Sequence, residues 1–247
     1  MALALCTLVL GACAAQKPPP PPPSGPDPVE VHLEAARRYA DGGRHEEAIM
    51  EYREALRLAP DMPDAWYRVG NSLYRTRDYE RAVKAYQNAI RLDPKHLKAY
   101  NNLGIALTDR GSPEKAAAVL RRATSLDPSY TKAWISLGIA YYQLGQYPKS
   151  SLTLKEALRI DPDSRDAYAN LGNAYAIQNL NDEAIEAYRR ALRLDPKDAN
   201  THFNLGQTYA KVGRDSEARI QVEILEGLDP LRADELRRRL RLGPGPS

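Results

Sequence analysis

Long apolar stretches and concentrated charge are both missing from this sequence of 247 residues. No run approaches the ~20 apolar residues that a bilayer-spanning helix needs. Lys and Arg number 35 and Asp and Glu 32, with the two signs mixed throughout, so the net charge is only +3. Because nucleic-acid binding favours a concentrated basic face, this pattern indicates a solvated helical surface and no nucleic-acid partner.

Catalytic and metal-binding patterns are lacking as well. The four histidines, His32, His45, His96 and His202, are scattered, with no cysteines or paired carboxylates at ligand spacing. There is no glycine-rich phosphate loop, nucleophile elbow or HExxH motif. We therefore expect no enzymatic activity, no metal site and no cofactor. Phenylalanine occurs once and tyrosine 15 times, and a tyrosine can bury its ring while its hydroxyl stays near water.

The pattern that is present is a repeat of 34 residues, which runs from Val29 to Arg232 without an insertion or deletion. Within it Trp66, Gly70, Ala82 and Pro94 recur in kind. Gly70, for example, is followed by Gly104, Gly138, Gly172 and Gly206. A fixed period of this size indicates a stacked repeat architecture. The expected units are 29–62, 63–96, 97–130, 131–164, 165–198 and 199–232.

Each unit is predicted to form two helices, which in 63–96 run from Asp64 to about Arg75 and from about Tyr79 to Leu92. The turn between them contains a residue that easily adopts positive φ in most units, namely Gly43, Gly111, Gly145 and Gly213. A mid-helix glycine such as Gly70 costs up to ~1 kcal/mol of helix propensity. Its column must therefore serve packing, and with the Ala82 column it is expected to let the paired helices approach closely.

These columns resemble those of the tetratricopeptide repeat (TPR) family. The resemblance implies an all-α fold, a right-handed superhelix (α-solenoid) of six helix-turn-helix repeats whose first helices line a concave groove. Residues 233–247 are predicted to form a capping helix, Ala233 to Leu242, and a tail. Leu236 and Leu240 would cover the last unit, and the arginines at 237–239 would face solvent.

The first 13 residues resemble the signal of a bacterial lipoprotein. Ala2 to Ala12 is a short apolar run typical of a secretory signal. It ends in Leu10-Gly11-Ala12-Cys13, which is similar to the lipobox. The resemblance implies cleavage before Cys13 and lipidation of its thiol, while Cys6 would be removed with the signal. The alternative is a cytosolic protein with an apolar tail and an incidental cysteine.

Residues 14–28 are predicted to be a proline-rich tether. Six consecutive prolines at 18–23 exclude a core or a helix and favour extended polyproline II. At about 3.1 Å per residue the tether would reach on the order of 40 Å. Such a spacer suits a folded body that stands off a membrane, which favours the lipoprotein interpretation. An Asp after the lipidated Cys favours the inner membrane in Gram-negative lipoproteins, so Ala14 and Ala15 imply the periplasmic face of the outer membrane.

Candidate binding residues lie on the predicted first helices, away from the core stripe. Ile135, Ile139 and Tyr142 share one face of a helix whose core residues lie on another, so a second apolar face needs cover. An apolar segment or amphipathic helix of a partner would suit, as would the C-terminal helix or the tether of this chain. The candidate groove residues are Tyr67, Asn71, Tyr74, Asn102, Ile105, Ile135, Ile139, Tyr142, Asn170, Asn173, Phe203, Asn204 and Gln207.

Three of these residues, Asn102, Asn170 and Asn204, occupy one column at multiples of the repeat length. Repeated amides on a concave face could hold the backbone of an extended peptide. They could equally form hydrogen bonds to the adjacent unit.

Six repeats behind a lipidated start resemble the pilotins of type IV pilus secretins (PilF, PilW and Tgl). That resemblance implies a scaffold that binds secretin subunits and promotes their localisation and multimerisation in the outer membrane. An adaptor for peptidoglycan enzymes or other envelope complexes is the alternative. A cytosolic chaperone adaptor would need groove lysines, and it is disfavoured because the corresponding column holds Leu33, Tyr67, Asn101, Ile135, Ala169 and Phe203.

Overall fold

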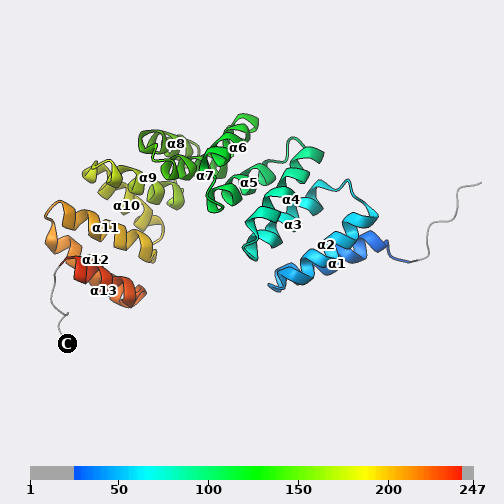
Figure 1. Ribbon diagram of the computed structural model, residues 1–247. Coiled ribbons are helices and arrows are strands. Elements are labelled where there is room, and N and C mark those ends of the chain that lie inside the picture. Colours follow the sequence, from blue (N-terminus) through cyan, green and yellow to red (C-terminus); the bar gives the residue numbers. More distant parts are fainter. Residues whose placement is uncertain (1–24, 241–247) are drawn as a thin grey trace, which may run out of the picture.

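The structure is a computed structural model, and it describes residues 25–240. Within this range the chain forms six successive helix pairs and a thirteenth helix along a curved array (Figure 1). The predicted all-α array of stacked helix pairs is confirmed. The helices are α1 Pro28–Asp41, α2 His45–Leu58, α3 Pro63–Arg75, α4 Tyr79–Leu92, α5 Leu97–Asp109, α6 Pro113–Leu126, α7 Thr131–Gln143, α8 Tyr147–Ile160, α9 Arg165–Ile177, α10 Asn181–Leu194, α11 Ala199–Lys211, α12 Asp215–Leu228 and α13 Pro230–Arg239.

The links between units are built around an aspartate and a proline. Asp93 follows α4, and its carboxylate accepts a hydrogen bond from the backbone N–H of Lys95 at 2.9 Å. The same contact recurs at Asp127, Asp161 and Asp195. Such Asx turns reverse the chain locally, and the proline between donor and acceptor cannot continue the preceding helix. The Asp-Pro pairs therefore end α4, α6, α8 and α10 at the same repeat position.

An aromatic column ties each first helix to the link that precedes it. The indole N–H of Trp66 donates to the carbonyl of Pro60 at 3.1 Å, and Trp134 donates to Pro128 at 3.0 Å. In the last unit His202 Nε2 lies 3.0 Å from the carbonyl oxygen of Pro196. The same contact, between a ring nitrogen of the aromatic column and a proline carbonyl, thus fixes the link in three units.

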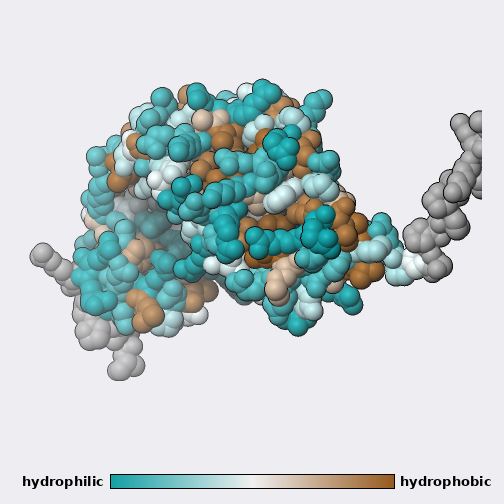
Figure 2. Space-filling view, turned by 45° about the vertical axis from the view of Figure 1, so that its right-hand side comes forward, coloured by the Kyte–Doolittle hydropathy of each residue, from teal (hydrophilic) through white to brown (hydrophobic). Residues whose placement is uncertain are grey.

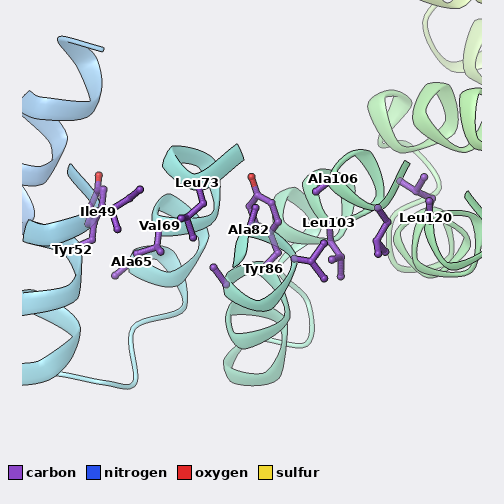
Figure 3. Close-up of a cluster of buried hydrophobic side chains, with 14 of the residues drawn as sticks. Ile49, Tyr52, Ala65, Val69, Leu73, Ala82, Tyr86, Leu103, Ala106 and Leu120 are labelled. Carbon is purple, nitrogen blue, oxygen red and sulfur yellow. The ribbon is translucent and has the colours of Figure 1, made fainter. Parts of the chain in front are cut away.

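The glycine column makes room for large side chains of the paired second helices. A Cβ at Gly70 would lie 2.5 Å from the Tyr86 ring, and one at Gly104 would lie 2.4 Å from Leu120. The Ala82 column is fully buried, and where it changes to Ser150 the hydroxyl donates to the Gly138 carbonyl at 2.7 Å. Figure 3 shows part of the resulting seam, which is continuous from α1 to α7.

The turn inside each unit needs a left-handed backbone. Gly43, Gly111, Gly145 and Gly213 have φ between 69° and 81°. The same position is filled in the other two units by Arg77 at φ 62° and Asn179 at φ 60°. A left-handed conformation costs a non-glycine residue roughly 1–2 kcal/mol, so Arg77 carries local strain.

Replacing Arg77 with glycine is expected to raise the free energy of unfolding by about 0.5–1 kcal/mol. Relief of the left-handed strain outweighs the larger backbone entropy that glycine loses on folding. Urea unfolding followed by circular dichroism measures the change. Arg91→Gly, at an exposed position inside α4, is the control and should lose about 0.5–1 kcal/mol. A destabilised Arg77→Gly variant would contradict the strain.

The terminal helix begins earlier than predicted. Only Asp229 separates α12 from α13, which starts at Pro230 instead of Ala233 because the Asp229 carboxylate accepts from the Arg232 N–H at 3.2 Å. Leu236 is fully buried, as predicted, and comes within 2.5 Å of a Cβ built on Gly206. Arg237 does not face solvent. Its side chain is 17% exposed and forms ion pairs with Glu226 and Asp234.

The N-terminal end also differs from the prediction. Pro28, assigned to the tether, is the first residue of α1, since the Asp27 carboxylate caps the helix by accepting from the Val29 N–H at 2.9 Å. The predicted signal, Cys13 and most of the tether lie outside the described residues. Within residues 25–240, no helix is long and apolar enough to cross a membrane.

Candidate protein-binding groove

The first helices lie along the inner side of the array. Contacts run in series through α3, α5, α7, α9 and α11, in addition to those within each pair. Such contacts between the first helices of neighbouring units are expected on the concave side of a curved helical array. The face of the molecule shown in Figure 2 is mostly hydrophilic, with hydrophobic patches among the polar side chains. The first helices, which carry the candidate residues, therefore share one concave face.

A first pocket of about 320 Å³ lies between α3 and α5. It brings together four of the predicted residues, Asn71, Tyr74, Asn102 and Ile105. Two residues absent from the prediction, Arg75 and Tyr86, complete the lining. Tyr86 belongs to the core stripe of α4, but it is long enough to pass through the core and present its hydroxyl to the groove.

A second pocket of about 370 Å³ lies between α9 and α11. It also gathers four predicted residues. The lining that prediction missed includes Tyr188 and Lys211, whose ammonium donates to the Asn179 side chain at 2.6 Å. The complete lining is Tyr142, Asn173, Ala176, Ile177, Tyr188, Asn204, Gln207, Thr208 and Lys211.

The two pockets contain the same hydrogen-bonded group of side chains, which we call an amide cluster. In the first, Asn71 Oδ1 accepts from the Tyr86 hydroxyl at 2.9 Å and from Asn102 Nδ2 at 2.9 Å. In the second, the residues three units later repeat it. Asn173 Oδ1 accepts from the Tyr188 hydroxyl at 2.8 Å and from Asn204 Nδ2 at 2.9 Å.

The amide clusters orient two donors. Burial raises the pKa of the Tyr86 and Tyr188 hydroxyls, so both stay protonated and donate. With each Oδ1 engaged twice, the side-chain NH₂ groups of Asn71 and Asn173 have no acceptor within residues 25–240. Because an amide NH₂ has two protons to donate, each cluster can serve an acceptor that enters the groove.

The amide column has two different roles. Asn102 and Asn204 form hydrogen bonds to the preceding unit, which is one of the two alternatives that the sequence left open. Asn170 joins no cluster, because its Nδ2 donates to the Asp166 carbonyl of its own helix at 2.8 Å.

Apolar side chains lie between the two amide clusters. Ile105, Ile135 and Ile139 are all partly buried. Ile135 and Tyr142 pack against the buried cluster that contains Leu154. The apolar face of α7 is therefore partly covered by the next unit.

Two tyrosines of α3 are held in place by unit three. The Tyr67 ring lies 6.0 Å from that of Tyr86, and its hydroxyl accepts from Asn102 at 3.3 Å. The Tyr74 hydroxyl donates to Asp109 at 2.5 Å. Burial, together with Asp109, raises the pKa of Tyr74 to about 12. Both contacts fix α3 against α5 along the groove.

Phe203 does not belong to the groove. It is 7% exposed and packs with Leu225 and Leu236 under α13. The guanidinium groups of Arg232 and Arg239 lie 5.7 and 5.5 Å from the centre of its ring. The prediction was wrong here because the C-terminal helix folds onto this end of α11. In the described part of the chain, no group of three or more His, Cys, Asp or Glu could hold a metal ion.

The fold and groove define a tetratricopeptide repeat scaffold, a class that binds protein partners and is generally non-catalytic. Within that class, the chain belongs to the family described as Cilia and flagella-associated protein 70 C-terminal domain, whose model matches residues 62–242. A TPR repeat model matches residues 36–76.

Solved structures share this fold. PilF of Pseudomonas aeruginosa has 19% identity, a TM-score of 0.71, and coverage of 86% of this chain and 97% of its own. A TPR protein of Parabacteroides merdae has 19% identity and a TM-score of 0.74, covering 87% and 86%. YrrB, described as having an unusual peptide-binding site, has 20% identity and a TM-score of 0.57, covering 76% and 97%. No curated protein matches the sequence.

Proposed function

We propose that this chain is a scaffold that holds an apolar segment of a partner protein in its concave groove. The observation that carries the proposal is the pair of amide clusters, three units apart, with isoleucines between them. The partner's side chains would cover Ile105 and Ile139. Its backbone carbonyls would accept from the NH₂ groups of Asn71 and Asn173.

The energies suit a moderate affinity. A hydrogen bond to a free amide contributes about 0.5–1.5 kcal/mol net. Burial of apolar surface contributes roughly 25 cal/mol per Å². The first helices from α3 to α11 form one continuous wall. The scaffold is therefore preorganised and loses little conformational entropy when a partner binds.

We further propose that the scaffold is a lipoprotein of the outer membrane, anchored through Cys13, and that it acts as a pilotin for a type IV pilus secretin. The lipobox and the proline-rich tether support the anchor. The repeat organisation shared with PilF supports the pilotin role, although that likeness concerns the fold. Mass spectrometry of the membrane fraction should find a cleaved, acylated Cys13. An unmodified Met1 terminus would overturn the anchor.

Deletion of the gene tests the pilotin role. We expect heat-resistant secretin multimers to disappear from the outer membrane while cell shape stays normal. Unchanged multimers would overturn the pilotin role. Altered cell shape with intact multimers would favour an adaptor for peptidoglycan enzymes instead.

Replacing Ile139 with aspartate is expected to weaken binding of the partner at least tenfold. A buried isoleucine contributes about 1.5–3 kcal/mol at an interface, and an unpaired carboxylate adds a desolvation cost. The measurement is recovery of the secretin subunit from solubilised membranes, followed by titration of the purified pair. The melting temperature should change little.

Leu152→Asp is the matched control. Leu152 is 64% exposed and lies on the second helix α8, so the same change of charge should leave binding intact. Equal binding by the Ile139→Asp variant would refute the groove.

A further inference from the structure

The first unit departs from the amide clusters in an informative way. Tyr52 lies 34 residues before Tyr86, and its ring is buried in the same manner, with 1% exposed. The two asparagine positions, however, are occupied by Arg37 and Arg68. The end of the groove nearest the N-terminus therefore has two guanidinium groups where the other clusters have a hydrogen-bonded pair of amides.

By the register of the repeat, the exposed side chains of Arg37 and Arg68 are placed beside the Tyr52 hydroxyl. Burial raises the pKa of this hydroxyl, Arg68 and Arg37 oppose the shift, and Asp41 adds to it. Arg68 is thus placed like its counterpart Asn102, which reaches back from one first helix to the preceding unit. Arg75 extends the basic surface, since it lies two turns further along α3 and lines the first pocket.

This arrangement leaves most of the guanidinium donors without a carboxylate partner. An asparagine pair can bond to itself, but guanidinium groups only donate and also repel each other. Arg37 pairs with the exposed Glu30 at 3.1 Å. Within residues 25–240, neither Arg68 nor Arg75 forms an ion pair with a carboxylate.

The acidic groups nearby do not complete the site. Asp41 lies at the end of α1 and is exposed, and Glu30 is already shared with Arg37. Asp109, near the end of α5, is engaged by the Tyr74 hydroxyl. A carboxylate that entered the groove beside Tyr52 would meet Arg37 and Arg68, and Arg75 lies two turns further along α3.

We propose that Arg37, Arg68 and Arg75 form a subsite for an acidic side chain of the protein segment that the groove binds. This inference rests on the proposed function and specifies the partner's chemistry. The segment has an apolar part that covers the isoleucines and an Asp or Glu on the side toward α1. Arginine suits this role because its planar fork donates two parallel hydrogen bonds to a carboxylate.

The experiment is a selection from a phage-displayed library of random 12-residue peptides against the full chain. The test variant combines Arg37→Asn and Arg68→Asn, which installs the residues of the other two clusters and should fold. The control variant combines Arg121→Asn and Arg122→Asn on the exposed face of α6, with the same change of charge. Ile139→Asp serves to show that the selected peptides occupy the groove.

The full chain should select peptides with an apolar centre and an acid on one side. The test variant should retain the apolar preference and lose the acidic one. Affinity for a selected peptide should fall about tenfold in the test variant and less than twofold in the control variant. Replacement of the peptide's acid by its amide should have the same effect as the test variant.

Three outcomes would overturn the subsite. Groove-bound peptides without acidic enrichment would refute it and leave the proposed function standing. An equal loss of affinity in the control variant would show a general charge effect. Failure to select peptides, or binding that Ile139→Asp does not weaken, would refute the groove and the subsite together.

Discussion

Replacing Leu236 with alanine should lower the free energy of unfolding by about 2–5 kcal/mol, the range for a large-to-small change in a packed core. Leu236 is fully buried and belongs to α13, the one helix within residues 25–240 that is not part of a helix pair. In the other units the space over the glycine column is filled by a residue of the paired second helix. Above Gly206, Leu236 of α13 comes nearest.

The loss should be concentrated at the C-terminal end. Repeat arrays are stabilised by nearest-neighbour interfaces, so a weakened cap opens the last unit before the rest. Hydrogen exchange should therefore accelerate in α11, α12 and α13 more than in α3 and α4. Leu231→Ala is the control, because Leu231 is 81% exposed and should change stability by less than about 0.5 kcal/mol. Uniform loss of protection along the array would contradict a capping role.

The six helix pairs could be predicted from sequence because every unit repeats the same pattern of residues. The first helices from α3 onward begin at Pro63, Leu97, Thr131, Arg165 and Ala199, a constant 34 residues apart. The thirteenth helix, α13, has no repeat-related counterpart among the preceding helices. The repeat places Pro230 in the column of Pro94 and so predicts a link there, whereas Asp229 caps a new helix at that point.

The candidate site was predictable to a different degree. A helical period assigns each residue to a face, and this was enough to place Asn71 and Asn102, and likewise Asn173 and Asn204, on the same side of the array. It could not predict that Tyr86 lines the pocket, because the ring of this residue lies in the core while its hydroxyl reaches Asn71 on the groove side. Nor could it show that Phe203 is covered, because the position of α13 depends on tertiary packing.

The departures of single units from the shared pattern carry the information about partners. One amide cluster is formed by the second and third units and the other by the fifth and sixth. The arginines come from the first and second units, and the isoleucines from the third and fourth. The columns that build the array, by contrast, are the same in any member of this class. Their effect on stability is consequently large, and their effect on specificity is small.

Replacing Gly172 with valine should lower the free energy of unfolding by about 3 kcal/mol, at the upper end for overpacking a core. A Cβ at this position would lie 2.5 Å from the Tyr188 ring. That ring is held by core packing on α10 and by the hydrogen bond to Asn173. The two methyl groups of valine add to the overlap, so the ring must move and the second amide cluster must open.

The two consequences can be measured separately. Urea unfolding should report the loss of stability, and the Tyr188 hydroxyl should become accessible to solvent, so that the raised pKa of this phenol returns toward its ordinary value. Gly227→Ala is the control, since Gly227 is also within a helix but has open space around it. It should gain about 0.5–1 kcal/mol. Equal stability of Gly172→Val and the parent chain would mean that the glycine column does not limit how closely the paired helices approach.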